Sequence, residues 1–217
     1  MDKTFRVHSG TRRAKRVPRT RLNYSASADC SQTRAATKKM ETWYNRRMSS
    51  IPEIETLKNK LTLERGKLLA ALDALSEAAR AEPFLDGWAV NDVLAHLAQA
   101  EIINLKFAKL MLTRDAPVQL RKVAAEYPDF TGPFELDRFN AYMTDKLRAR
   151  GFENILQTLH AARAETLAWM DTLEAEQLER RGVHAAWGDQ TVRGMLKILA
   201  LHDKMHTQDI LKKTAPQ

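Results

Sequence analysis

Residues 89–113 read AVNDVLAHLAQAEIINLKFAKLMLT, and this stretch decides the fold. Apolar residues recur in it at three- and four-residue steps, which is the period of an α-helix. They also lie on nearly every side of the predicted helix, a pattern typical of the central helix of a bundle. Polar residues, among them Asn91, Glu101 and Lys106, interrupt the apolar positions, so we expect this helix not to span a membrane.

Helical periodicity continues on both sides of this stretch. Apolar spacing predicts two further long helices, over residues 53–80 and 152–176, and a short helix over 134–149. Thr191 can cap a fourth long helix over residues 192–213, because its hydroxyl accepts hydrogen bonds from free backbone N–H groups. Four long helices are therefore expected to dominate the chain.

The segments between the predicted helices contain no run that alternates between polar and apolar residues over the length of a strand. Residues 114–133 include three prolines, which predicts a long connection between the second and third long helices. Residues 180–190 are expected to form a loop. The predicted fold class is all-α: a four-helix bundle with a long crossover between helices two and three.

Positive charge is concentrated at the start of the chain. The sequence holds 35 Lys and Arg residues against 27 Asp and Glu residues, and residues 1–47 alone contain 13 basic and 3 acidic ones. We interpret residues 1–47 as a basic, disordered extension and residues 48–217 as the bundle domain. A basic arm can also bind nucleic acid, which leaves a nucleic-acid-associated protein as the less favoured alternative.

The single cysteine, Cys30, excludes a disulfide framework and fits a cytoplasmic protein.

Three histidines in apolar helical segments form the strongest candidate site. His202 and His206 are one helical turn apart and share a face with apolar residues, so both are expected inside the bundle. His96 interrupts the apolar central helix, and the two helices could face each other. Two buried imidazoles are costly to leave unpaired, and a shared cation would satisfy both. Hydrogen-bonded core histidines and surface positions are the alternatives. His160 and His184 lack such spacing and are expected to be structural or exposed.

The residue types of this candidate site favour particular metals. Three histidines that leave one coordination position open are typical of catalytic metal sites, as opposed to closed structural ones. Zinc or nickel suits three imidazoles, whereas cations that prefer oxygen ligands do not. The site would lower the pKa of a thiol or water that binds at the open position.

The order and spacing of these residues resemble those of a known family. The segment WAVNDVLAHLAQAE (Trp88–Glu101), followed far downstream by HDKMH (His202–His206), is similar to the DinB-like superfamily of metalloenzymes, and most similar to its ClbS/DfsB branch. The resemblance covers roughly residues 53–213. The further segments that carry it are Asp137–Asn140, Ala161–Ala164 and Gly182–Gly188.

The resemblance implies a four-helix bundle, often a homodimer, with a divalent metal held by His96, His202 and His206 at one end. Some members of the superfamily are transferases or isomerases that use low-molecular-weight thiols, and a related bundle hydrolyses a cyclopropane to confer resistance. The function implied is thiol transfer or hydrolysis acting on a small electrophilic molecule, with a low-molecular-weight thiol as a candidate cosubstrate. The alternative is a metal-independent, ClbS/DfsB-like protein that binds a small molecule or confers resistance.

Four further residues are candidates for roles around the metal. Glu101 could orient a ligand or act as a base, or it could form a buried structural hydrogen bond. Asn140 lies in the predicted crossover and could cover the site, although packing and capping are the favoured interpretation. Arg163 is either an ion-pair partner within the bundle or a clamp for an anionic substrate. Asp203 points about 100° away from His202, which favours the helix surface or a hydrogen bond to a ligand over ligation.

Overall fold

The computed structural model of this chain describes residues 30–214. Residues 1–29, the larger part of the predicted basic extension, lie outside the described residues. The chain divides into two compact units, residues 1–40 and 41–217, and the bundle belongs to the second. The division into an extension and a bundle domain at residue 47 stays a prediction.

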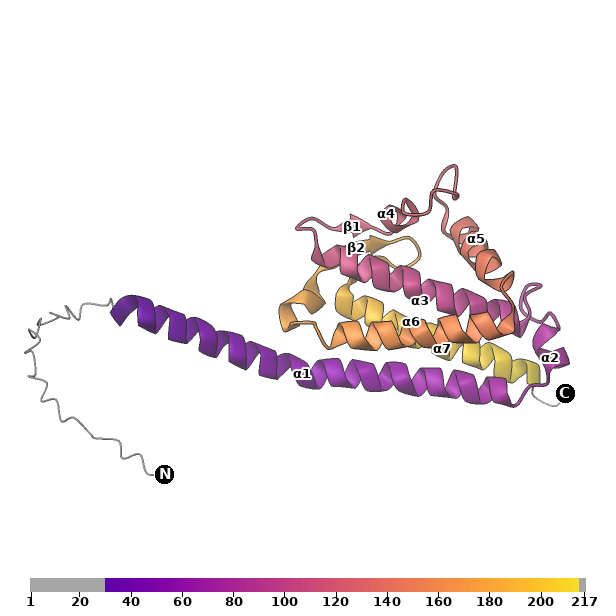
Figure 1. Ribbon diagram of the computed structural model, residues 1–217, viewed down its shortest axis with the longest axis horizontal. Helices are drawn as coiled ribbons and strands as arrows, with labels where there is room; N and C mark the ends of the chain where they lie inside the picture. Colours follow the sequence, from indigo (N-terminus) through magenta and orange to yellow (C-terminus); the bar gives the residue numbers. More distant parts are fainter. Residues whose placement is uncertain (1–29, 215–217) are drawn as a thin grey trace, which may run out of the picture. The chain divides into compact units, whose positions relative to one another are not determined.

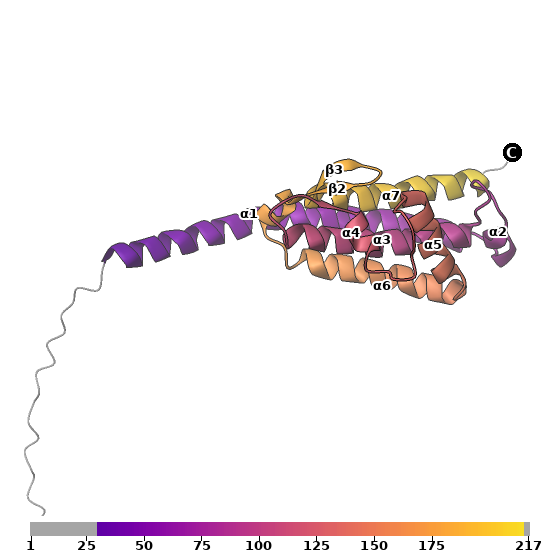
Figure 2. The same cartoon turned by 90° about the horizontal axis from the view of Figure 1, so that it is seen from above.

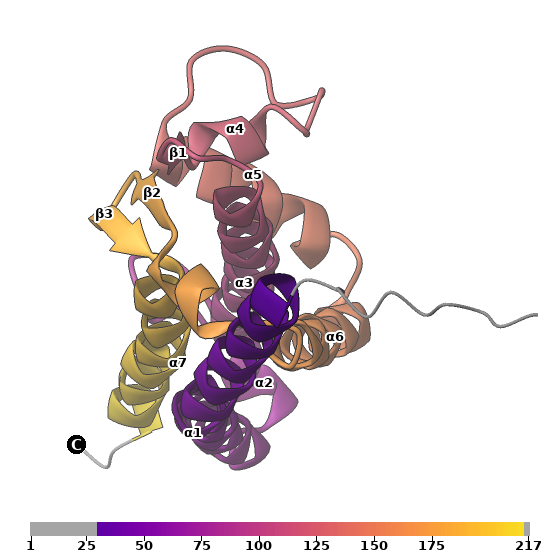
Figure 3. The same cartoon turned by 90° about the vertical axis from the view of Figure 1, so that its left-hand side faces the viewer.

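Four long helices form the bundle, as predicted, and in Figures 1 and 3 the later part of the first lies side by side with the other three. No helix among the described residues is both long and apolar enough to cross a membrane. The long helices are α1 (Cys30–Asp73), α3 (Val90–Leu112), α6 (Phe152–Met170) and α7 (Val192–Thr214). The shorter elements are α2 (Glu77–Ala81), β1 (Val118–Gln119), α4 (Arg121–Ala124), α5 (Leu136–Arg148), the 3-10 helix η1 (Ala175–Glu179), β2 (Arg181–His184) and β3 (Gly188–Thr191).

Helix α1 differs from its predicted bounds at both ends. It begins at Cys30 and passes through Pro52, close to where the sequence predicted its start. A proline disfavours a helical backbone but does not forbid it. The helix ends at Asp73, and Ser76 then caps the separate helix α2 by accepting a hydrogen bond from the Ala79 N–H at 3.2 Å. The prediction of one continuous helix to residue 80 was therefore wrong.

The segment expected to be a loop, residues 180–190, contains a β-hairpin. Strands β2 and β3 pair antiparallel, with Arg181 opposite Thr191 and His184 opposite Gly188. Strand β1, from the crossover, adds to β2 in parallel, so that the strand order is β1-β2-β3. Strands of two and four residues are too short to show the polar–apolar alternation on which the sequence prediction relied.

Gly182 allows strand β2 to lie against helix α3. A Cβ atom at this position would come within 2.6 Å of Phe107 Cζ and within 3.0 Å of the Val118 carbonyl oxygen, so any side chain would clash. Because successive residues of a strand face opposite sides, His184 lies on the same face as Gly182, and both are buried. The imidazole of His184 packs edge-on against Phe107, with ring centroids 6.1 Å apart.

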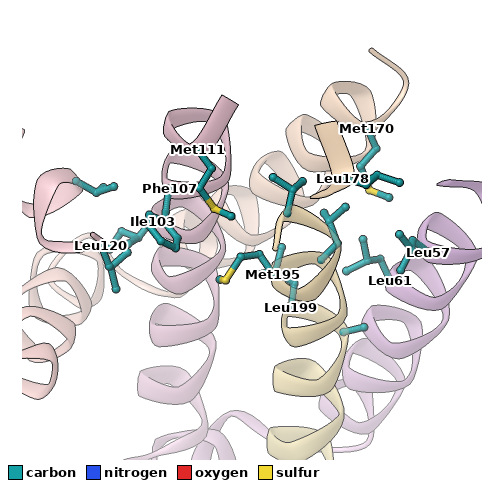
Figure 4. Packing of buried hydrophobic residues seen from close by; sticks show 14 of the residues in the cluster. Leu57, Leu61, Ile103, Phe107, Met111, Leu120, Met170, Leu178, Met195 and Leu199 are labelled. Atoms are coloured by element: carbon teal, nitrogen blue, oxygen red, sulfur yellow. The ribbon is translucent and has the colours of Figure 1, made fainter. Parts of the chain in front are cut away.

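Two hydrophobic clusters fill the bundle, and a cluster of charges lies between them. Figure 4 shows part of the first cluster, where α1, α3 and α7 meet η1 and the crossover. On each long helix a buried charged residue lies between the two clusters, and on α1 the buried Glu64 precedes it. Each set consists of a core residue of one cluster, the charged residue and a core residue of the other cluster. The sets are Leu61, Arg65 and Leu68 on α1; Leu97, Glu101 and Ile103 on α3; Leu159, Arg163 and Met170 on α6; and Leu199, Asp203 and Ile210 on α7.

The four charged side chains, one from each long helix, form a closed network of ion pairs. Arg65 contacts both oxygens of Asp203 at 3.0 Å and Glu101 at 2.7 Å. Arg163 contacts Glu101 through Nε at 2.8 Å and Asp203 through Nη2 at 2.9 Å. Each of the four residues is at most 6% exposed. Burial alone would raise the pKa of Glu101, but Arg163 and Arg65 outweigh it and hold the pKa below its ordinary value.

Replacement of Glu101 by Ala is expected to destabilise the bundle by about 3–5 kcal/mol, because two buried guanidinium groups lose a shared counter-charge. The matched control is Glu165→Ala, which removes a more exposed ion pair between α6 and Lys109 of α3. That change is expected to cost at most about 1 kcal/mol. Urea denaturation of both variants measures the difference. Equal losses would contradict the role assigned to the network.

Candidate metal centre

Helices α3 and α7 bring three imidazoles together. His96 comes from α3, whereas His202 and His206 lie one turn apart on α7. The Nε2 atom of His202 lies 3.1 Å from Nε2 of His96 and 3.2 Å from Nε2 of His206. One nitrogen of each ring lies within 4.8 Å of those of the other two, an arrangement that could hold a metal ion.

The positions of the imidazole nitrogens suit the ligands of a tetrahedral metal ion better than they suit hydrogen bonds between the imidazoles. An imidazole Nε2 carries either one proton or one lone pair along a single direction, yet Nε2 of His202 faces two nitrogens at close range. A zinc–nitrogen distance of about 2.0–2.1 Å places two ligands of a tetrahedral ion about 3.3 Å apart. The separations of 3.1 and 3.2 Å are close to that value.

Two neighbouring residues lie against the imidazoles. The Nδ1 atom of His206 lies 3.2 Å from an Asp209 carboxylate oxygen, and metal-bound histidines usually hold such a carboxylate at their other nitrogen. The indole of Trp88 packs edge-on against His96, with centroids 5.3 Å apart. Sequence reasoning missed Asp209, although a carboxylate three residues after a histidine on a helix lies on the same face.

Burial keeps the three imidazoles neutral. It lowers the pKa of His96 to about 4, with a further contribution from His206. It lowers the pKa of His202 to about 2, helped by the two neighbouring histidines and by Arg65. The pKa of His206 is also lowered by burial, against the opposing effect of Asp209. Neutral imidazole has the free lone pair that a metal needs, so all three are ready to bind a cation at neutral pH.

A pocket of about 220 Å³ adjoins the histidines and is lined by His96 and His202. In Figures 1 and 2 the crossover and the β-hairpin lie against α3 and α7, and residues of both line the pocket. Helix α5 of the crossover places Asn140 in the pocket wall, although packing and capping were the favoured interpretation, whereas the neighbouring Phe139 is fully buried in the core. The remaining polar and aromatic lining residues are Asn104, Asp137, His184 and Trp187.

The other candidates lie elsewhere. Glu101, Arg163 and Asp203 join the buried ion-pair network and are not among the pocket residues. Arg163 is thus placed as an ion-pair partner within the bundle. Of the two alternatives for Asp203, the helix surface was wrong, because its side chain is buried between Arg65 and Arg163. Sequence reasoning missed Arg65, whose signal was its position in the apolar stripe between Leu61 and Leu68.

Two other histidines, His160 and His184, were expected to be structural or exposed, and the structure places them in different environments. His160 is exposed on α6. His184 is buried and lines the pocket beside His202. Burial lowers the pKa of His184 to about 4, so this imidazole is also neutral at neutral pH.

Comparison with known proteins identifies the family. Residues 60–210 match the DinB superfamily, and the chain belongs to it. The fold is similar to a solved structure whose title states that YfiT from Bacillus subtilis is a probable metal-dependent hydrolase with an unusual four-helix bundle topology. The two chains are 20% identical, with a TM-score of 0.58, and the match covers 74% of this chain and 85% of that one. No curated protein matches the chain.

The buried histidines predict the pH dependence of stability in the metal-free protein. Their pKa values lie below the ordinary 6.5, so the unfolded chain binds more protons once the pH falls below that value. The free energy of unfolding is therefore expected to decrease from about pH 7 to about pH 5. Denaturation in the presence of a chelator measures this decrease. The variant His202→Leu should flatten the dependence, and the exposed control His160→Gln should not. A stability that is the same at both pH values would contradict the assignment.

Proposed function

We propose that this protein is a divalent-metal-dependent enzyme that hydrolyses a small electrophilic molecule. The observation that carries the proposal is the meeting of His96, His202 and His206, all neutral and with their nitrogens facing one another, at a pocket large enough for a small ligand. Zinc or nickel is the metal that three imidazoles favour. Such an ion supplies Lewis acidity, which polarises a substrate and lowers the pKa of a water or thiol group.

Other residues of the chain position the imidazoles, cover the substrate and align the helices. Asp209 lies beside Nδ1 of His206, and Trp88 packs against the ring of His96, which limits how far the two rings can turn. The crossover, through Asn140, and the hairpin, through Trp187, cover the substrate and limit the access of bulk water. The ion-pair network keeps α3 and α7 in the register that the three histidines require.

The charge of the pocket favours hydrolysis over thiol transfer. Low-molecular-weight thiols of cells commonly carry carboxylates, which need Lys or Arg partners. No Lys or Arg is found among the described residues that line the pocket, and Asp137 adds a negative charge. The similarity in fold to a protein described as a probable metal-dependent hydrolase is consistent with this choice. Thiol transfer is the second reaction that the same metal centre would support.

A metal-independent protein of the ClbS/DfsB type is the second candidate function. It is favoured by the resemblance of residues 182–188 to that branch, because this segment supplies the buried His184 of the pocket. In that case the imidazoles would bind the ligand or act as bases, and turnover or binding would continue in chelated protein.

Metal content tests the proposal directly. The full-length chain, purified without a histidine tag or chelator, is expected to contain close to one zinc or nickel ion per chain by mass spectrometry. His202→Ala is expected to lose most of it, because two imidazoles bind a divalent ion far more weakly than three. His160→Gln is the matched control and should retain the metal. Equal metal content in His202→Ala would overturn the assignment.

Chelation tests the reaction. Hydrolysis of a panel of small uncharged amides and esters is expected to fall at least about a hundredfold on chelation and to return with added zinc. Addition of glutathione should leave the rate unchanged if water is the nucleophile. A rate that survives complete metal removal would favour the metal-independent candidate, and a rate that requires the thiol would favour transfer.

A further inference from the structure

The imidazole of His184 is held in one tautomer. Its Nδ1 accepts hydrogen bonds from the backbone N–H groups of Ala186 at 3.1 Å and Trp187 at 3.3 Å. A ring nitrogen that accepts hydrogen bonds carries the lone pair, so the ring proton lies on Nε2. No hydrogen bond within the described part of the chain engages Nε2, and the residue lines the pocket. His184 therefore offers the pocket an N–H donor.

Asn104 offers the same pocket an acceptor. It is 8% exposed, it lines the pocket, and its buried Oδ1 has no hydrogen-bond partner among the described residues. A buried amide oxygen that stays unpaired costs free energy, which a donor group on a ligand would recover. His96, Ala100 and Asn104 follow one another at four-residue steps on α3, so Asn104 lies on the face that carries His96, about 12 Å further along the axis.

The packing of strand β2 against α3 brings the donor, His184, to the part of the pocket wall that holds the acceptor, Asn104. Because Gly182 has no side chain, β2 lies close to α3 and presents His184 to Phe107. Phe107 follows Asn104 by three residues on α3, which places both on neighbouring positions of one helix face. The histidine triad and the pair His184 and Asn104 are thus two separate groups of side chains around one pocket.

We propose that His184 and Asn104 recognise a carboxamide group of the substrate. The amide carbonyl accepts a hydrogen bond from His184 Nε2–H, and the amide N–H donates to Asn104 Oδ1. An ester presents the acceptor without the donor, so it leaves Asn104 unpaired. The lack of Lys and Arg among the described lining residues fits an uncharged group. A carboxamide is thereby the substrate class of the proposed function. Hydrolysis of the carboxamide rests on the proposed function, whereas its binding by His184 and Asn104 does not.

Binding of matched probes tests the proposal on the full-length chain. Benzamide and methyl benzoate are titrated at millimolar concentrations, with and without zinc, while the ¹⁵N signals of the histidine rings are followed by NMR. His184 is expected to show the Nε2–H tautomer, and benzamide is expected to shift its signal and to bind about tenfold more tightly than methyl benzoate. An Nδ1–H tautomer, equal affinities, or no shift with benzamide would overturn the proposal.

Variants separate recognition from metal binding. Asn104→Leu is expected to weaken benzamide about tenfold and to leave methyl benzoate unchanged, whereas Asn104→Asp, which keeps an oxygen acceptor, should restore much of the affinity. His184→Phe should weaken both probes, and His160→Gln neither. Metal content should stay the same in all four variants. If His202→Ala loses its metal and keeps its affinity for benzamide, the result supports recognition by His184 and Asn104 independently of the reaction. An unchanged affinity for benzamide in Asn104→Leu would overturn the proposal.

Discussion

The bundle depends on four buried charges, Arg65, Glu101, Arg163 and Asp203, one from each long helix. A buried charge is tolerated only with its partners in place, so a shift of any helix along or around its axis would leave a charge uncompensated. Hydrophobic contacts on either side of the network are less directional and would allow such shifts at a smaller cost. The network therefore sets the register of the helices, and the packed clusters supply the larger part of the stabilisation.

The same register brings the candidate metal centre together. On α3, His96 lies five residues before Glu101, and on α7, His202 lies directly before Asp203. These offsets turn the imidazoles toward the pocket and the carboxylates toward the centre of the bundle. The two groups also affect each other, because Arg65 contributes to the low pKa of His202. The positive charge of Arg65 opposes protonation of the His202 ring and so leaves its lone pair free.

Elements outside the four long helices supply part of the pocket wall. The crossover and the β-hairpin together supply Asp137, Asn140, His184 and Trp187 to the pocket wall. Gly182 is the residue that lets the hairpin lie on α3. Under the proposed function, a change of sequence in these connections would alter part of the pocket wall while the helices keep the three histidines, and one fold can in this way support more than one activity.

The sequence by itself determined the helical bundle, because its apolar period is long and regular, and it also identified His96, His202 and His206 from their spacing and apolar setting. It did not show that Arg65 completes a charge network, because a lone arginine in an apolar stripe has no visible partner until four helices meet. Nor did it show the hairpin, whose strands are too short for a periodic signal. The tautomer of His184 is set by a local turn, in which the backbone N–H groups two and three residues further on donate to its Nδ1, but only the packing of β2 against α3 places this ring beside the pocket. The unpaired oxygen of Asn104 was decided by the tertiary structure, since segments far apart in the chain bury this side chain.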